Sequence, residues 1–101
     1  MIDVIRKILG LSPRVNMAEL ISNGATIIDV RTREEYRSGH VEGSVNIPLD
    51  QLTSGLKKIK NKEQVIITCC ASGMRSATAK TILKSQGYSN VHNGGSWRNL
   101  I

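Results

Sequence analysis

A short loop in this sequence combines a cysteine, a glycine and an arginine at a spacing that could activate the thiol. The loop follows an apolar run at 65–69, leads into a helix-like stretch ending at Gln86, and reads Cys70-Ala71-Ser72-Gly73-Met74-Arg75. The start of a helix carries partial positive charge and unpaired N–H groups, and Arg75 adds a full charge. Because such a field favours thiolate over thiol, we predict that Cys70 is a nucleophile with an anion held beside it.

The segments on either side of the loop alternate between strand-like and helix-like patterns. Apolar, β-branched runs predict strands at 26–30, 44–47, 65–69 and 90–92. Apolar residues at helical spacing predict helices at 17–23, 33–38, 51–59 and 74–86, with one more turn within 96–101. This alternation predicts an α/β fold, a small and mostly parallel sheet with helices on both faces. Ligands of such sheets bind at the carboxyl ends of strands, where Asp29 and Cys70 both lie.

Side chains near the helix starts and along the last long helix give two finer expectations. Short polar side chains accept hydrogen bonds from the free N–H groups of a first turn. The capping residues predicted in this way are Asn16, Thr32 and Asp50. The residues of the last long helix that we expect to face the core are Ala77, Ile82 and Leu83.

The composition fits one compact domain at 1–101, which opens with a short amphipathic helix at 1–10. We expect this helix to pack on the domain, the alternative being contact with a membrane or a partner. Hydrophobic residues make up 40%, aromatic residues 3%, and the net charge is +6. So few aromatic residues disfavour a base-stacking surface, and we expect no nucleic-acid partner. A dense lysine cluster at Lys57, Lys58, Lys60 and Lys62 is interpreted as a solvated face, the alternative being attraction of anionic substrates or an acidic carrier protein.

Neither the cysteines nor the start of the chain indicates secretion. Two adjacent cysteines do not make a disulfide framework. The apolar residues at 1–10 are interrupted by charges, unlike those of a signal peptide, and the sequence has no apolar run long enough to span a membrane. We therefore expect a cytoplasmic protein without a membrane partner, and a monomer.

Three segments resemble the rhodanese-type sulfurtransferases. The first is the apolar strand with its Cys-x-Ser-Gly-x-Arg-Ser loop and the helix that follows. The second is Asp29-Val30-Arg31 followed by the stretch 35–48, which is similar to the amino-terminal signature of that family. The third is Asn93-Gly94-Gly95-Ser96-Trp97, near the carboxyl end. The three occur in the family's order, and the resemblance spans 17–97.

This resemblance implies a two-step sulfur transfer through a persulfide on Cys70. The donor is a small anionic sulfur compound such as thiosulfate, and the acceptor is a thiol or a protein. Loop N–H groups can form a nest for the anion, Arg75 can clamp an oxyanion, and Gly73 lets the backbone curl around the sulfur. The expected substrate-binding residues are Ala71, Ser72, Gly73, Met74 and Arg75. No cofactor is expected, because the sulfur is carried covalently.

Other polar residues are expected to support this loop rather than to react. Asp29 and Arg31 are predicted to brace it by hydrogen bonds and ion pairing, since a nearby carboxylate would raise the thiol pKa. Cys69 should point away from Cys70 and pack in the core, with a resolving role through a vicinal disulfide as the alternative. We expect no metal site, because adjacent cysteines lack the usual zinc-ligand spacing. His40 and Trp97 are assigned to packing.

Three other functions compete with this interpretation. Cysteine-dependent phosphatases place five residues between cysteine and arginine, whereas four intervene here, which suits a single sulfur atom better than a phosphate. A thioredoxin-like oxidoreductase needs two cysteines separated by two residues, whereas Cys69 and Cys70 are adjacent, which disfavours this function. The third is a sulfur-relay or protein-binding module with little free turnover. Ala71 and Met74 make the mouth of the loop more apolar than is common in small family members, which puts thiosulfate in doubt as the physiological donor.

Overall fold

Four parallel strands form the centre of the protein, whose computed structural model describes residues 15–101. The strands are β1 (Thr26–Asp29), β2 (Val45–Asn46), β3 (Ile66–Cys70) and β4 (Val91–Ser96). Their order across the sheet is β2-β1-β3-β4, and all three neighbouring pairs are parallel. This confirms the predicted α/β class with a small parallel sheet. The amphipathic helix predicted at 1–10 lies outside the described residues.

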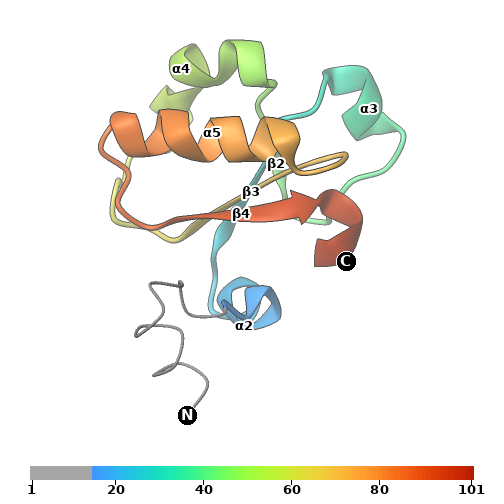
Figure 1. Ribbon diagram of the computed structural model, residues 1–101, viewed down its shortest axis with the longest axis horizontal. Helices are drawn as coiled ribbons and strands as arrows, with labels where there is room; N and C mark the ends of the chain where they lie inside the picture. Colours follow the sequence, from blue (N-terminus) through green and yellow to red (C-terminus); the bar gives the residue numbers. More distant parts are fainter. Residues whose placement is uncertain (1–14) are drawn as a thin grey trace, which may run out of the picture.

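Helices cover both faces of this sheet, as predicted. The α-helices are α2 (Met17–Ser22), α3 (Arg33–Arg37), α4 (Leu52–Gly55) and α5 (Met74–Ser85). Residues 15–101 also hold three 3₁₀ turns, η1 (Leu49–Gln51), η2 (Leu56–Lys58) and η3 (Trp97–Leu100). Figure 1 shows α4 and α5 on one side of the strands and α2 on the other. Within residues 15–101 no helix has the length and apolar character needed to cross a bilayer.

The two faces of the sheet bury two separate apolar cores. The larger core joins the sheet to α4 and α5, through Leu52, Ala79 and Leu83 among others. The smaller core lies under α2 and η3, around Ile67 and Leu100. Side chains alternate along a strand, so each buried strand contributes to both cores. The sheet is therefore held rigidly from both sides, which fixes the positions of the strand ends.

Two predicted caps form as expected, while the third does not. Asn16 accepts a hydrogen bond from Glu19 N–H at 3.1 Å. Thr32 and Glu35 form a reciprocal capping box at the start of α3. Asp50, by contrast, caps nothing, because the predicted helix 51–59 is divided into the short pieces η1, α4 and η2. The prediction of one continuous helix there was wrong.

Gly55 accounts for part of that division. Glycine destabilises a helix interior by about 1 kcal/mol relative to alanine. A Cβ at Gly55 would come within 2.6 Å of Cγ2 of Ile47, the residue after β2, so the close approach of this segment to Ile47 favours glycine. Packing against Ile47 thus imposes a residue that favours short turns over a longer helix.

Two further expectations were incorrect in detail. Ala77 is exposed, and the buried residues of α5 are Ser76, Ala79 and Leu83. β4 continues to Ser96, beyond the end predicted at His92. Glycine has a low propensity for strands, which is why the sequence pattern ended this strand early. The structure leaves no room for a larger residue at Gly94, because a Cβ there would lie 2.7 Å from Ile67 Cγ2. The longer β4 brings its last residues alongside the end of β3, where Cys70 lies.

Candidate active site

Cys70 is the last residue of β3, and its side chain is buried on the face of the sheet that α5 covers. Cys69 points to the opposite face and packs with Ile67 and Leu100. This is the alternation expected for neighbouring strand residues. Burial and the charge of Asp29 raise the pKa of the Cys69 thiol to about 12. Cys69 is therefore a neutral core thiol at physiological pH, and the two sulfurs belong to different environments.

Hydrogen-bond donors of the loop and of α5 surround the sulfur of Cys70. Gly73 N–H donates to Sγ at 2.9 Å, and Ser76 N–H donates at 3.4 Å. The thiol donates to Ser76 Oγ at 3.5 Å, and in the thiolate form the same hydroxyl can donate to the sulfur. Burial acts to raise the pKa of Cys70, but hydrogen bonds from the Ser76 side chain and from the backbone of Ser76, Gly73 and Ser72 outweigh it and lower the pKa below its ordinary value. The site therefore stabilises a thiolate.

Gly73 makes this arrangement possible by its backbone conformation. Its φ is +103°, which L side chains rarely adopt, and it directly precedes α5. A Cβ there would also lie 3.4 Å from Gly95 Cα. The loop therefore curls back so that the Gly73 N–H points at the sulfur of its own strand end.

Asn93 on β4 connects this loop to the edge of the sheet. Its Oδ1 accepts from Ser76 Oγ at 2.6 Å and from Gly95 N–H at 2.9 Å, and its Nδ2 donates to the carbonyl of Gly73 at 3.3 Å. Neither Ser76 nor Asn93 was among the site residues predicted from the sequence. The sequence offered two signals for them, since Ser76 directly follows Arg75 and Asn93 precedes a pair of glycines. The two residues come into contact because β4 extends to Ser96 and so carries Asn93 past the start of α5.

Arg75 makes a bidentate ion pair with Glu35 instead of lying free over the loop. Its Nη1 donates to Glu35 Oε1 at 2.7 Å and its Nη2 to Oε2 at 3.0 Å. Hydrogen bonds from Arg75 and from the backbone of Thr32 lower the pKa of Glu35 to about 2. The pKa of Arg75 is raised, chiefly by the same hydrogen bonds from Glu35. The sequence prediction treated Arg75 as a cation open to an oxyanion and missed Glu35 as its partner.

Asp29 and Arg31 form a buried ion pair with each other, with Nη2 and Oδ2 2.7 Å apart. Arg31 also donates to the backbone carbonyls of Glu35 and Gly39 at 3.2 and 2.7 Å, and its guanidinium lies 4.6 Å from the ring centre of Trp97. The expected direct brace on the loop was incorrect, because these contacts run to α3 and the turn after it. Arg31 is thereby linked to Glu35, the partner of Arg75, and the charge of Asp29 also helps to raise the pKa of Arg75.

The remaining loop residues form the rim of the site. Ala71, Ser72 and Met74 are exposed, and Met74 is 79% exposed despite being apolar. The two described histidines are occupied elsewhere: His40 Nδ1 bonds the carbonyl of Tyr36 and His92 Nε2 bonds Asn90 Oδ1. Across residues 15–101 no group of three potential metal-ligating side chains comes together.

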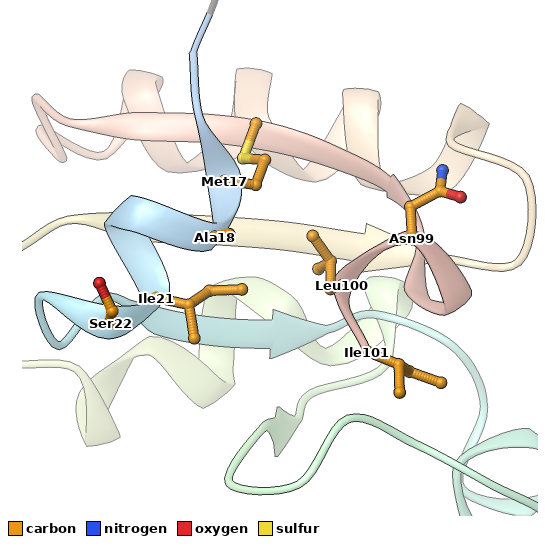
Figure 2. A pocket seen from close by; sticks show the side chains of 7 residues that line it. All are labelled: Met17, Ala18, Ile21, Ser22, Asn99, Leu100 and Ile101. Carbon is orange, nitrogen blue, oxygen red and sulfur yellow. The ribbon is translucent and has the colours of Figure 1, made fainter.

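A cavity of about 350 Å³ adjoins the loop. Its lining residues are Val30, Thr32, Pro48, Leu49, Asp50 and Arg75. A second cavity, of about 250 Å³, lies on the other face of the sheet between α2 and the carboxyl end, and none of the loop residues line it (Figure 2). The larger of these two cavities is therefore the one that shares a residue, Arg75, with the loop.

Known proteins match this chain in both sequence and structure. The family model of the rhodanese-like domain matches residues 15–97. Thiosulfate sulfurtransferase PspE of Escherichia coli is 35% identical over 74 residues, which cover 72% of this chain and 71% of that protein. Human thiosulfate:glutathione sulfurtransferase is 30% identical, covering 89% of this chain and 94% of that protein. The solved structure of a rhodanese with anions from E. coli has a TM-score of 0.71 at 34% identity, covering 75% and 91% of the two chains.

Proposed function

Because this chain belongs to the rhodanese-like domain family, we propose that it is a sulfurtransferase that carries a sulfane sulfur as a persulfide on Cys70. The observation that carries this proposal is the set of donors around one sulfur, the N–H groups of Gly73 and Ser76 with the Ser76 hydroxyl. A thiolate is the attacking form in sulfur chemistry, and these donors hold it. Cys69 has the opposite environment and takes no part in the transfer.

The reaction proceeds in two displacements. The Cys70 thiolate attacks the outer sulfur of thiosulfate, a new S–S bond forms, and the donor's own S–S bond breaks as sulfite leaves with the electron pair. An acceptor nucleophile, cyanide in an assay or a thiolate, then attacks the outer sulfur of the persulfide. The S–S bond to Cys70 breaks and the thiolate returns. The sulfur is held covalently between the steps, so the transfer uses no cofactor.

The rim and the neighbouring cavity are the proposed substrate-binding region. It comprises Ala71, Ser72, Gly73, Met74 and Arg75, with the cavity beside Arg75. Donors are small sulfur anions, and acceptors are thiols or a protein that presents one. Two free cysteines fit a reducing cytoplasm and a monomer that needs no intermolecular disulfide.

A sulfur-relay protein is the second candidate, and the 79% exposed Met74 favours it. An apolar side chain at the rim suits contact with a protein acceptor better than with a small anion. Such a protein would load sulfur on Cys70 but turn over slowly with free acceptors. The two candidates share the first step and differ only in the second.

Intact-mass measurement after incubation with thiosulfate tests the shared step, and cyanide turnover tests the second. We expect one added sulfur atom on the wild type and on Cys69→Ser, and none on Cys70→Ser. Loading without turnover would support the relay. Loading of Cys70→Ser but not of Cys69→Ser would show that the wrong cysteine has been assigned. Aryl phosphate hydrolysis that Cys70→Ser abolishes would falsify the proposal in favour of a phosphatase.

A further inference from the structure

Arg75 is paired with a carboxylate of its own chain. Both terminal nitrogens of its guanidinium contact the carboxylate of Glu35, at 2.7 and 3.0 Å. The side chains of Arg75 and Glu35 are 36% and 35% exposed, so a solute can reach them. An arginine fork that holds one carboxylate bidentately has that face occupied. An incoming anion must therefore compete with Glu35 for the guanidinium.

The position of Glu35 is set by α3 and is not that of a loose surface side chain. Its Oε1 accepts from Thr32 N–H at 3.0 Å, while its own N–H donates to Thr32 Oγ1 at 3.2 Å. Arg31, itself buried against Asp29, donates to the carbonyl of Glu35 at 3.2 Å. These contacts hold the carboxylate toward the loop and make its competition with an anion persistent.

The charges around the adjoining cavity do not favour a doubly charged anion. Among its described lining residues Arg75 is the one cation, and Asp50 supplies a carboxylate. Glu35 adds a second carboxylate directly on Arg75. The remaining walls include the apolar side chains of Val30 and Leu49. A donor with less charge and an apolar substituent matches these walls better than a dianion does.

We propose that Glu35 is a specificity-determining residue that, by occupying Arg75, weakens the use of dianionic sulfur donors and favours monoanionic donors that carry an apolar group. This inference rests on the proposed sulfur transfer and concerns only which donor the site prefers. Glu35 touches neither the sulfur nor the bond that breaks. It acts through Arg75.

Two donors that differ by one charge make the inference testable. Thiosulfate transfers its outer sulfur to the Cys70 thiolate and releases the sulfite dianion. The methanethiosulfonate anion transfers the same kind of sulfur: an S–S bond forms to Cys70, the donor's S–S bond breaks, and methanesulfinate leaves with the electron pair. Both reactions yield the same persulfide on Cys70. Their kcat/KM ratio therefore reports donor recognition.

Glu35→Gln is the informative variant. Glutamine keeps an oxygen that can accept from Thr32 N–H in a capping box, but it carries no charge to hold Arg75. Glu34→Gln is the matched control, since it makes the same change in net charge on the same helix, and Glu34 makes no salt bridge within residues 15–101. Thermal melting of both variants shows whether each is folded.

We expect Glu35→Gln to lower KM for thiosulfate about tenfold, the gain from one charge-assisted contact at the lower end of its range. The effect on methanethiosulfonate should be about threefold, because the Coulombic energy scales with the charge of the donor. Glu34→Gln should leave the ratio of the two donors unchanged. In Arg75→Ala, adding Glu35→Gln should no longer change that ratio.

An unchanged ratio in Glu35→Gln overturns the inference, as does an equal change in Glu34→Gln or a change that survives the loss of Arg75. These results leave the proposed function intact as long as intact mass shows sulfur on Cys70. Failure of both donors to load Cys70 in the wild type instead overturns the sulfur-transfer proposal, and this inference with it.

Discussion

The hydroxyl of Ser76 lies 2.6 Å from Asn93 Oδ1, which joins the first turn of α5 to β4 beside the sulfur of Cys70. A hydroxyl has one hydrogen to donate. With a neutral thiol that hydrogen can go to Asn93 Oδ1 or to the carbonyl of Gly73, 3.0 Å away, and the thiol donates to Ser76 Oγ. With a thiolate the hydroxyl can turn to the sulfur, and Asn93 Oδ1 keeps its bond from Gly95 N–H. The pair can therefore serve both protonation states of Cys70 without moving the backbone.

Ser76→Ala should raise the pKa of Cys70. The variant removes the hydroxyl that lowers this pKa and keeps the backbone N–H donors. A hydrogen bond to a charged group contributes about 1.5–3 kcal/mol, so the midpoint of the alkylation profile should move to clearly higher pH. The rate of iodoacetamide alkylation against pH measures it. Ser72→Ala is the control, since Ser72 contributes through its backbone; an equal effect there would argue against the hydroxyl.

Asn93→Asp should also raise the pKa of Cys70, by another route. The aspartate keeps an acceptor for Ser76 and for Gly95 N–H, but it brings a negative charge toward the thiolate and removes the donor to the Gly73 carbonyl. The same alkylation profile, shifted to higher pH, is the expected result. An unshifted profile in Asn93→Asp would mean that a charge at position 93 does not affect the pKa of Cys70.

Arg31→Ala should destabilise the fold by about 3–5 kcal/mol, because it leaves the buried carboxylate of Asp29 without its partner. Arg33→Ala is a matched control: Arg33 is exposed, and its side chain bonds only Gln51 among the described residues, so a change within about 0.5 kcal/mol is expected. Urea unfolding of both variants measures the difference. Similar midpoints for the two would show that the Asp29–Arg31 pair contributes little.

Local patterns in the sequence predicted the parts of the site that one segment builds. The apolar run before Cys70, the glycine at 73 and the helix after it place the loop at a strand end, and strand alternation separates Cys69 from Cys70. The cap at Thr32 was likewise predicted from a short-range pattern, whereas the reciprocal bond from Glu35 was found only in the structure. Each depends on residues within a few positions of one another, where spacing and conformation are directly linked.

Contacts between distant segments could not be predicted in this way. Arg75 and Glu35 are 40 residues apart in sequence, and their pairing depends on how β1 and β3 set α3 against the loop. Asn93 reaches Ser76 only because β4 continues through two glycines that pack closely on the sheet. The positions of charged residues along a chain do not determine which opposite charges are neighbours in the folded protein. Arg75 was therefore interpreted as a free cation.

Cys69 should make the protein less stable at alkaline pH. Its pKa is about 12 in the fold and about 8.5 in an unfolded chain. Because the folded pKa is the higher one, the contribution of Cys69 to stability is fully present below about pH 8.5 and is lost as the pH rises toward 12. Over that window the unfolded state has released a proton that the folded state retains, and the slope approaches about 1.4 kcal/mol per pH unit.

Cys69→Ser removes that titration, so its unfolding free energy should fall less steeply than that of the wild type between about pH 9 and 11. Cys70 has the opposite sign, because its folded pKa is the lower one. Its contribution is present above the unfolded pKa and is lost as the pH falls through the folded value, so Cys70→Ser should retain the alkaline loss of the wild type. Urea unfolding at a series of pH values compares the three proteins. If Cys69→Ser kept the steep alkaline slope and Cys70→Ser lost it, the two cysteines would have each other's environments, and Cys70 could not be the thiolate that the loop stabilises.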